Sequence, residues 1–159
     1  MKKLLTALLV VALPIASAVA VGDGWMARGV GKILLGGRTE DHGDDGVLVF
    51  DLSVRSEGGQ VQGSLLAAAE GEDHGEDFPD VIIRIPEIQY AELNGDTVFF
   101  AGDGFVIFEE AFVVGWVKHS PGTLDGDEFM VYAITPFGGM HWQGGGHLAS
   151  GFVYIGPAN

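Results

Sequence analysis

The chain has 159 residues, of which 22 are acidic and eight are basic, and its formal net charge is −14 at pH 7. So large an acidic excess argues against binding to nucleic acid or insertion at an anionic membrane surface, since both attract basic proteins. The chain contains no cysteine, which excludes a disulfide framework and a thiol nucleophile.

The first 20 residues have the pattern of a secretory signal peptide. Two lysines open the segment, an apolar stretch runs from Leu4 to Ile15, and small residues at 16–20 provide a cleavage site. We therefore expect an exported protein, periplasmic or extracellular, in which residues 1–20 are removed. A single secreted domain at 21–159 follows, and it keeps all 22 acidic residues but only six of the basic ones.

Short runs rich in Val, Ile, Phe and Leu, separated by glycines, make up the rest of the chain. Apolar and polar residues alternate in several of them, as Leu48, Phe50 and Leu52 do with Asp51 and Ser53, and this alternation is typical of strands buried on one face. No run keeps the 3.6-residue period of a helix. The pattern predicts eight strands: Trp25–Leu35, Val47–Ser56, Val61–Ala69, Val81–Leu93, Thr97–Gly102, Ala111–His119, Glu128–Thr135 and Gly146–Ile155.

The connections between these strands indicate how they are arranged. Asn94-Gly95 predicts a tight hairpin, and Pro86 predicts a bulge, an edge position or a division of the fourth strand into two. Short sequential connections favour an all-β fold, either a single antiparallel up-and-down barrel or a barrel-like sandwich, with eight to nine strands. Large aromatic side chains are expected to fill its interior: Phe50, Phe99, Phe100, Phe105, Phe112 and Trp116.

An acidic hexapeptide that contains histidine occurs twice, at 40–45 and at 72–77. In a meander these copies fall in the first and third connections, which lie at the same end, together with Asp103, Glu109, Glu110 and His141. Imidazole suits zinc or copper and carboxylate oxygens suit calcium, although neither copy completes an EF-hand loop. The candidate ligands of a divalent cation are His42, Asp44, Asp45, His74, Glu76 and Asp77. The alternative is a pair of acidic loops that only keep the protein soluble.

Four stretches rich in turn residues carry a resemblance to a known family: GGQVQG at 58–63, LNGDTVFFAG at 93–102, PGTLDGDEF at 121–129 and GGGHLASG at 144–151. With these stretches the chain resembles bacterial secreted β-barrel modules of the post-COAP type, a family of unknown function. The resemblance implies an eight-stranded barrel-like fold. It implies no catalytic residues.

The sequence leaves three functions open. The first is a secreted non-catalytic module with a structural or interaction role at or outside the cell envelope, acting by self-association or on an envelope or extracellular protein. The second is a divalent-cation-binding protein, and the third is a carrier of a small ligand in the barrel. An enzyme is not expected, because no nucleophile frame or phosphate-binding glycine pattern is present. Apolar residues on both faces of strands such as Val81-Ile82-Ile83 disfavour an outer-membrane barrel.

Overall fold

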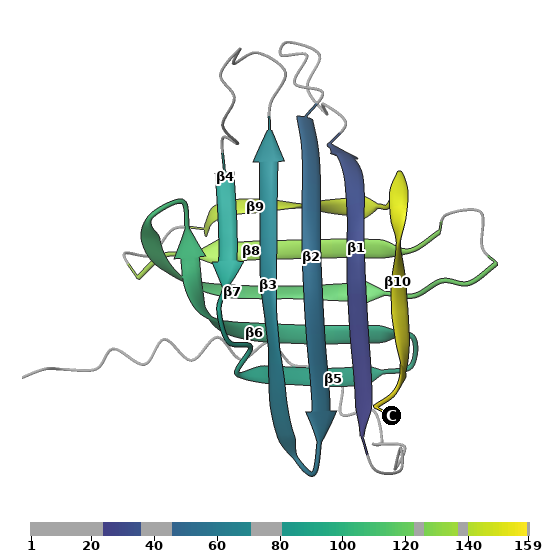
Figure 1. Ribbon diagram of the computed structural model, residues 1–159. Coiled ribbons are helices and arrows are strands. Elements are labelled where there is room, and N and C mark those ends of the chain that lie inside the picture. Colours follow the sequence, from purple (N-terminus) through teal and green to yellow (C-terminus); the bar gives the residue numbers. More distant parts are fainter. Residues whose placement is uncertain (1–23, 36–45, 71–80, 123–125, 137–139, 159) are drawn as a thin grey trace, which may run out of the picture.

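The computed structural model describes residues 24–35, 46–70, 81–122, 126–136 and 140–158, and every regular element in these ranges is a β-strand (Figure 1). The strands are β1 (Trp25–Leu35), β2 (Gly46–Glu57), β3 (Gln60–Glu70), β4 (Val81–Ile85), β5 (Tyr90–Asn94), β6 (Thr97–Val106), β7 (Glu109–Lys118), β8 (Glu128–Ile134), β9 (Met140–His147) and β10 (Ser150–Pro157). They pair antiparallel in the order β10-β1-β2-β3-β4-β6-β7-β8-β9, and β5 pairs with β6 outside this path. The all-β antiparallel prediction is confirmed.

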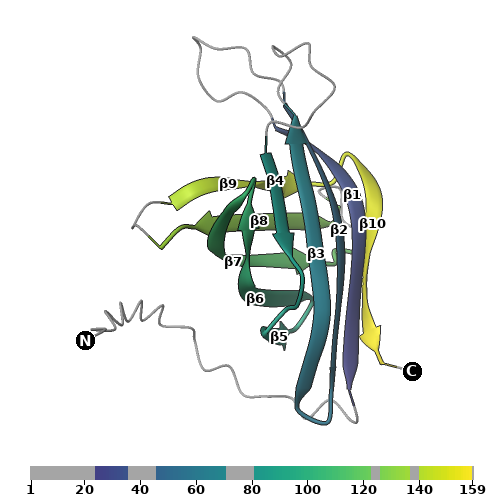
Figure 2. The same cartoon turned by 60° about the vertical axis from the view of Figure 1, so that its left-hand side comes forward.

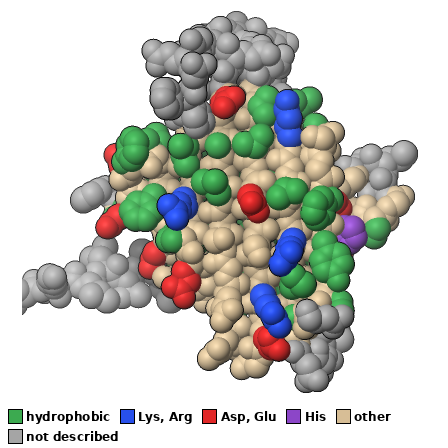
Figure 3. Space-filling view, viewed as in Figure 1, with side chains coloured by type: hydrophobic (Ala, Val, Ile, Leu, Met, Phe, Trp, Pro, Cys, Tyr) green, Lys and Arg blue, Asp and Glu red, His purple; other side chains and the backbone are tan. Residues whose placement is uncertain are grey.

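The sheet curls on itself into a half-barrel with two layers (Figures 1 and 2). β10 and β1 to β4 form the first layer, and β5 to β9 form the second layer, whose strands cross behind those of the first. The sheet passes from one layer to the other where Ile83 pairs with Val106 and Arg84 with Phe105. On the outer face of the first layer, turned to the viewer in Figure 3, hydrophobic and basic side chains lie together. Closure into a complete barrel stays a prediction.

Two predicted strands are each divided in the structure, which raises the strand count to ten. Pro86 separates β4 from β5, in agreement with one of the three outcomes expected for it. The prediction of a single last strand at Gly146–Ile155 was wrong, because β9 begins at Met140 and a turn at Leu148 and Ala149 leads into β10. A Cβ at Gly145 would lie 2.2 Å from the Phe129 carbonyl oxygen, so this part of β9 approaches β8 too closely for side chains. Such a strand carries no alternating pattern.

The core lies between the layers and is built from alternate side chains of the strands. The Phe50 ring from the first layer stacks on the Phe129 ring from the second, with centroids 4.0 Å apart and planes inclined by 5°. The centroid of the Phe100 ring lies 6.3 Å from that of Phe129, with the ring planes inclined by 21°. The predicted inward position is thus confirmed for Phe50 and Phe100. These rings fill the space where the two layers cross.

The inward position was wrong for four of the six aromatic residues: Phe99, Phe105, Phe112 and Trp116. Each alternates with a buried residue on the same strand, for example Phe99 with Val98 and Phe100. Where neighbouring residues are both aromatic or apolar, hydrophobicity does not indicate which of them faces the core. A shift of the strand pairing by one residue exchanges the two faces of a strand. The outer face of the second layer is therefore rich in aromatic side chains.

The described residues include no helix that is long and apolar enough to cross a membrane.

Candidate functional site

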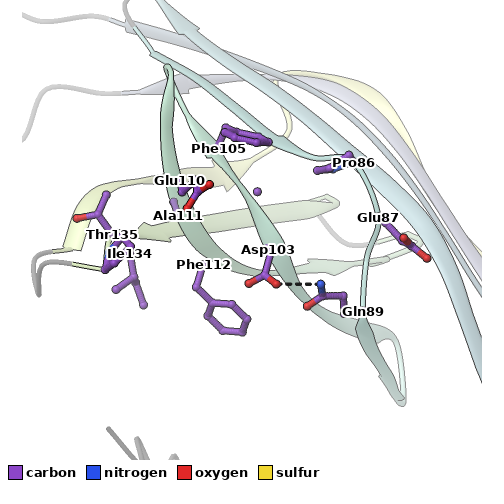
Figure 4. Close-up of a pocket in the computed structure, with 12 residues that line it drawn as sticks. Pro86, Glu87, Gln89, Asp103, Phe105, Glu110, Ala111, Phe112, Ile134 and Thr135 are labelled. Atoms are coloured by element: carbon purple, nitrogen blue, oxygen red, sulfur yellow. Dashed lines mark hydrogen bonds between the residues drawn. The ribbon is translucent and has the colours of Figure 1, made fainter. Parts of the chain in front are cut away.

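A surface cleft of about 710 Å³ opens on the second layer, beside the connection between β4 and β5 (Figure 4). Three carboxylates contribute to its lining, from Glu87, Asp103 and Glu110, and so do the rings of Phe105 and Phe112. The lining includes no lysine or arginine. The cleft is therefore a negatively charged hollow with an aromatic surface.

The strand register explains how carboxylates and rings come to alternate in the cleft. Asp103 lies directly opposite Phe112, and Phe105 lies directly opposite Glu110, in the pairing of β6 with β7. Opposite side chains on one face of a sheet are close neighbours, and diagonal pairs are within reach of long or aromatic side chains. Each ring in the cleft thus has a carboxylate beside it. Ile134 extends the apolar part, because it pairs with Phe112 across β7 and β8.

One wall of the cleft is formed by residues 86–89, where Pro86 interrupts the sheet. Ile88 fixes this segment, because its side chain is fully buried and its amide donates to the Gly63 carbonyl oxygen at 2.8 Å. Gln89 then donates from Nε2 to Oδ2 of Asp103 at 3.0 Å, as the dashed line in Figure 4 shows. The amide holds Asp103 in one orientation at the edge of the cleft. The Pro86 interruption therefore positions a binding group as well as dividing a strand.

The floor of the cleft depends on a close approach of two backbones. A Cβ at Gly104 would lie 2.2 Å from the Arg84 carbonyl oxygen, a contact that real side chains do not make. Only glycine lets β6 run this near to β4 where the sheet passes between the layers. Gly104 thus sets the position of Asp103 and Phe105 on either side of it.

The chemistry of the cleft suits a cationic group. Phe105 and Phe112 are 42% and 47% exposed, so a ligand in the cleft can reach both side chains. A guanidinium can pair with a carboxylate and stack on a neighbouring ring at the same time, a combination that a compact ammonium achieves less well. The three carboxylates of the lining would repel an anionic ligand. The arrangement therefore favours an arginine-like ligand with an apolar neighbour.

A second polar cluster, centred on Asp127, ties the connection between β7 and β8 to β10. Oδ1 of Asp127 accepts from the Ser120 amide at 2.9 Å and lies 3.0 Å from Nδ1 of His119, and Oδ2 accepts from the Val153 amide at 2.7 Å. Burial alone would raise the pKa of Asp127, but these amide bonds and the imidazole lower it below its ordinary value. Both oxygens are bonded to protein groups from two parts of the chain, so the cluster is a structural clasp.

All six candidate metal ligands from the repeated hexapeptide lie outside the described residues: His42, Asp44, Asp45, His74, Glu76 and Asp77. The strand ends that flank both copies are described, and they are neighbours. Leu35 pairs with Gly46, Val47 with Glu70, and Ala69 with Val81. Segments 36–45 and 71–80 are thus attached to the same end of the first layer, as expected. Within the described ranges, no group of three His, Asp or Glu side chains is arranged to hold a metal ion.

The sequence also predicts that the β6–β7 connection, with Asp103 and Glu110 beside it, lies at this same end. The structure agrees with that prediction only in part. The turn between β6 and β7 does meet the first layer there, since the Ile107 amide donates to the Ile82 carbonyl oxygen at 2.6 Å. Asp103 and Glu110 face the cleft on the second layer instead of the end of the first. The side chain of His141 lies outside the description. Two crossed layers cannot bring every alternate connection to one rim, as a simple barrel would.

Sequence reasoning missed the cleft because it assigned Phe105 and Phe112 to the interior. One signal could have found it: Gly102 and Gly104 alternate with Asp103 and Phe105, which is the pattern of a close backbone approach on one face and a polar, aromatic surface on the other. Comparisons with protein-family models, with curated proteins and with solved structures find no match. Function is therefore inferred from the geometry of the described residues and from the sequence.

Proposed function

We propose that the chain is a secreted, non-catalytic interaction module that acts at or outside the cell envelope. Its cleft binds a cationic, partly apolar surface of a protein partner. The observation that carries this proposal is the arrangement of the Asp103 and Glu110 carboxylates around the exposed rings of Phe105 and Phe112. Carboxylates beside open aromatic faces recognise guanidinium groups by charge and by stacking.

Three further observations support a binding role at the surface. The polar and aromatic groups of the lining are three carboxylates, one amide, one hydroxyl and two rings, which suit recognition better than bond-making chemistry. The stacked rings of Phe50, Phe100 and Phe129 fill the space between the layers, which favours the surface over an interior ligand. The pattern of residues 1–20 supports export, and the resemblance to post-COAP-type modules supports a role without catalysis.

The test is a titration of the ¹⁵N-labelled chain with N-acetyl-arginine amide, followed by amide chemical shifts. Its neutral isostere, N-acetyl-citrulline amide, is the control ligand. We expect arginine to shift the amides around Asp103, Phe105, Glu110 and Phe112 in a saturable way, and citrulline to leave them in place. A double variant, Asp103→Asn with Glu110→Gln, should lose the response because it removes the charge and keeps the shape.

The matched control variant is Glu92→Gln, on the same layer but outside the cleft. Glu92 accepts a hydrogen bond from the Tyr90 hydroxyl, and glutamine keeps an acceptor there. This variant should bind arginine as the unchanged chain does. Equal responses to arginine and citrulline, or shifts spread evenly over all exposed carboxylates, would show that the cleft has no preference for a cation.

We also propose a second function, the binding of a divalent cation by the repeated hexapeptides. It is supported by the adjacent attachment of the two segments at Leu35, Gly46, Glu70 and Val81. A cation bound only by the folded chain raises its melting temperature by mass action. Thermal unfolding after chelation, and then with calcium, zinc or copper, measures this shift. Replacing His42 and His74 with Ala should abolish it for zinc or copper, and unchanged melting with every ion would reject the function.

A further inference from the structure

Basic side chains are concentrated on one surface of this acidic protein. The structure describes five basic residues, and four of them point outward from the first layer: Arg28, Lys32, Arg55 and Arg84. Among the described residues, the negative charge on that surface comes from Asp51, Glu57 and Glu70. We call the outward side of β10 and β1 to β4 the basic–apolar face. Its described residues include four basic side chains and three acidic ones, whereas acidic residues outnumber basic ones by 14 in the whole chain.

Exposed apolar side chains lie between these charges, as the green and blue side chains in Figure 3 show. The exposed set comprises Val30, Leu34, Val49, Leu66, Ile82, Phe152 and Tyr154. One row across the sheet joins both kinds of residue through successive strand pairs: Phe152, Val30, Asp51, Leu66, Arg84 and Phe105. Large exposed apolar patches mark interaction surfaces in soluble proteins.

The extent of the basic–apolar face is close to what a specific interface needs. Five strands about 4.8 Å apart, followed for about eight residues at roughly 3.3 Å each, cover about 600 Å². Burying this area on each of two partners removes about 1,200 Å² from water, which is near the lower limit of specific protein–protein interfaces. The face can therefore support an association that is reversible and depends on concentration.

The outward side of β5 to β9, which we call the acidic–aromatic face, has the opposite character. It carries the cleft, and beyond the cleft Phe99 pairs with Trp116 and Trp116 with Met130, all facing outward. Its acidic residues are Glu92, Asp103, Glu110 and Glu128, against Lys118 as its one basic residue among those described. The two layers lie on opposite sides of the half-barrel (Figure 2), and their outward faces adjoin where Arg84 pairs with Phe105. Basic residues outnumber acidic ones on the first face, and acidic residues outnumber basic ones on the second, among those described.

We propose that the basic–apolar face of one copy docks on the acidic–aromatic face of a second copy. This inference rests on the proposed function of the cleft and names its partner. Basic side chains such as Arg28 and Lys32 then meet Asp103 and Glu110, and the exposed aliphatic groups cover the rings. Each docked copy still presents one unused face, so the contact is head-to-tail and continues into chains of molecules instead of closing as a dimer.

The test is sedimentation velocity of the exported chain over a range of protein concentrations. The unchanged protein should form species larger than a dimer as its concentration rises. Arg28→Glu with Lys32→Glu should remain monomeric, and so should Asp103→Lys with Glu110→Lys. The second result is informative because that variant has a smaller net negative charge than the unchanged protein. A general reduction of repulsion would increase its association instead.

The combination of all four substitutions should restore chain formation, because each reversed face again meets its complement and the net charge returns to its original value. A control with one charge reversed at a hairpin end outside both faces, Asp96→Lys, should associate like the unchanged protein. Circular dichroism and thermal unfolding of each variant establish that it is folded.

Three outcomes would overturn the inference. Monomers at all concentrations would exclude self-association, and if arginine still binds the cleft, the proposed function stands with a different partner. A defined dimer that survives Asp103→Lys with Glu110→Lys would indicate a symmetric contact between two basic–apolar faces. Failure of the fourfold variant to associate, while it remains folded, would show that the two faces do not meet.

Discussion

Replacing Asp127 with Asn tests whether the clasp between the β7–β8 connection and β10 contributes to stability. The carboxylate accepts the Ser120 and Val153 amides and lies against His119, with a side chain that is 17% exposed. Asparagine has nearly the same shape but offers one acceptor oxygen and no charge. It therefore leaves at least one of the two amides facing an NH₂ group that cannot accept its hydrogen bond.

The loss of stability follows from the number of hydrogen bonds that are removed and from how deeply they are buried. A hydrogen bond to a charged group stabilises a protein by about 1.5–3 kcal/mol, and an unsatisfied buried donor costs about 1–3 kcal/mol. Asp127→Asn removes one hydrogen bond to a charged group and weakens a second, in a partly buried site. The free energy of unfolding should therefore fall by roughly 2–3 kcal/mol. For a domain of this size, that loss lowers the melting temperature by about 6–10 °C.

The effect should also depend on pH with a definite sign. The pKa of Asp127 is lower in the folded chain than its ordinary value of 3.8. A group of this kind stabilises the fold fully above its unfolded pKa and loses that contribution as the pH falls through the lower, folded value. The difference in unfolding free energy between the two proteins should therefore be constant near neutral pH. It should shrink only below about pH 3.8, where the unfolded chain begins to bind a proton at Asp127 while the folded chain resists it.

Urea unfolding followed by tryptophan fluorescence, from pH 7 to pH 2.5, measures both quantities. The matched control is Asp51→Asn, at an exposed carboxylate on the basic–apolar face. Surface substitutions away from such networks change stability by less than about 0.5 kcal/mol. A loss no larger for Asp127→Asn than for Asp51→Asn, or a difference that stays constant down to pH 2.5, would refute the role assigned to the clasp.

Three further predictions concern the passage between the layers, the core and self-association. Gly104→Ala should destabilise the chain by about 1–3 kcal/mol in urea unfolding, because its Cβ cannot remain 2.2 Å from the Arg84 carbonyl oxygen. It should also weaken arginine binding at the cleft. Phe129→Ala should cost about 3–5 kcal/mol, since it removes a buried ring stacked on Phe50, and Phe129→Leu should cost less. Self-association should be strongest at intermediate ionic strength, because salt screens the repulsion between distant charges before it screens contacting pairs. A steady decrease of sedimentation coefficient from low salt upward would contradict this.

The strands with clear alternation could be predicted closely from the sequence, and those without it could not. Leu48, Phe50, Leu52 and Val54 alternate with polar residues, so β2 was expected within one residue of its observed ends. Val98, Phe99 and Phe100 are all apolar, and only the pairing register decides which of them faces the core. The sequence of β9, with Gly144, Gly145 and Gly146 in succession, contains almost no side-chain information.

The candidate site was harder to predict than the fold, because it depends on positions brought together by the crossing of two layers. Asp103 and Glu110 were recognised as acidic residues near a strand end. Their meeting with Phe105 and Phe112 follows from the β6–β7 register and from the bend at Pro86, which local patterns do not determine. Conversely, the repeated hexapeptide stands out in the sequence and lies outside the described residues.

The pairing of β1 with β10 has a consequence for the order in which the chain folds. Trp25 pairs with Pro157, whereas every other strand pair joins segments much closer in sequence. Non-local contacts of this kind form late, because the entropy of closing a long loop must be overcome before the contact contributes. The hairpins of each layer should assemble first, and the outer edge of β1 should stay open to water until β10 arrives. A chain interrupted before β10 would expose that edge, and the delay between hairpin formation and β10 docking is the period in which aggregation is most favoured.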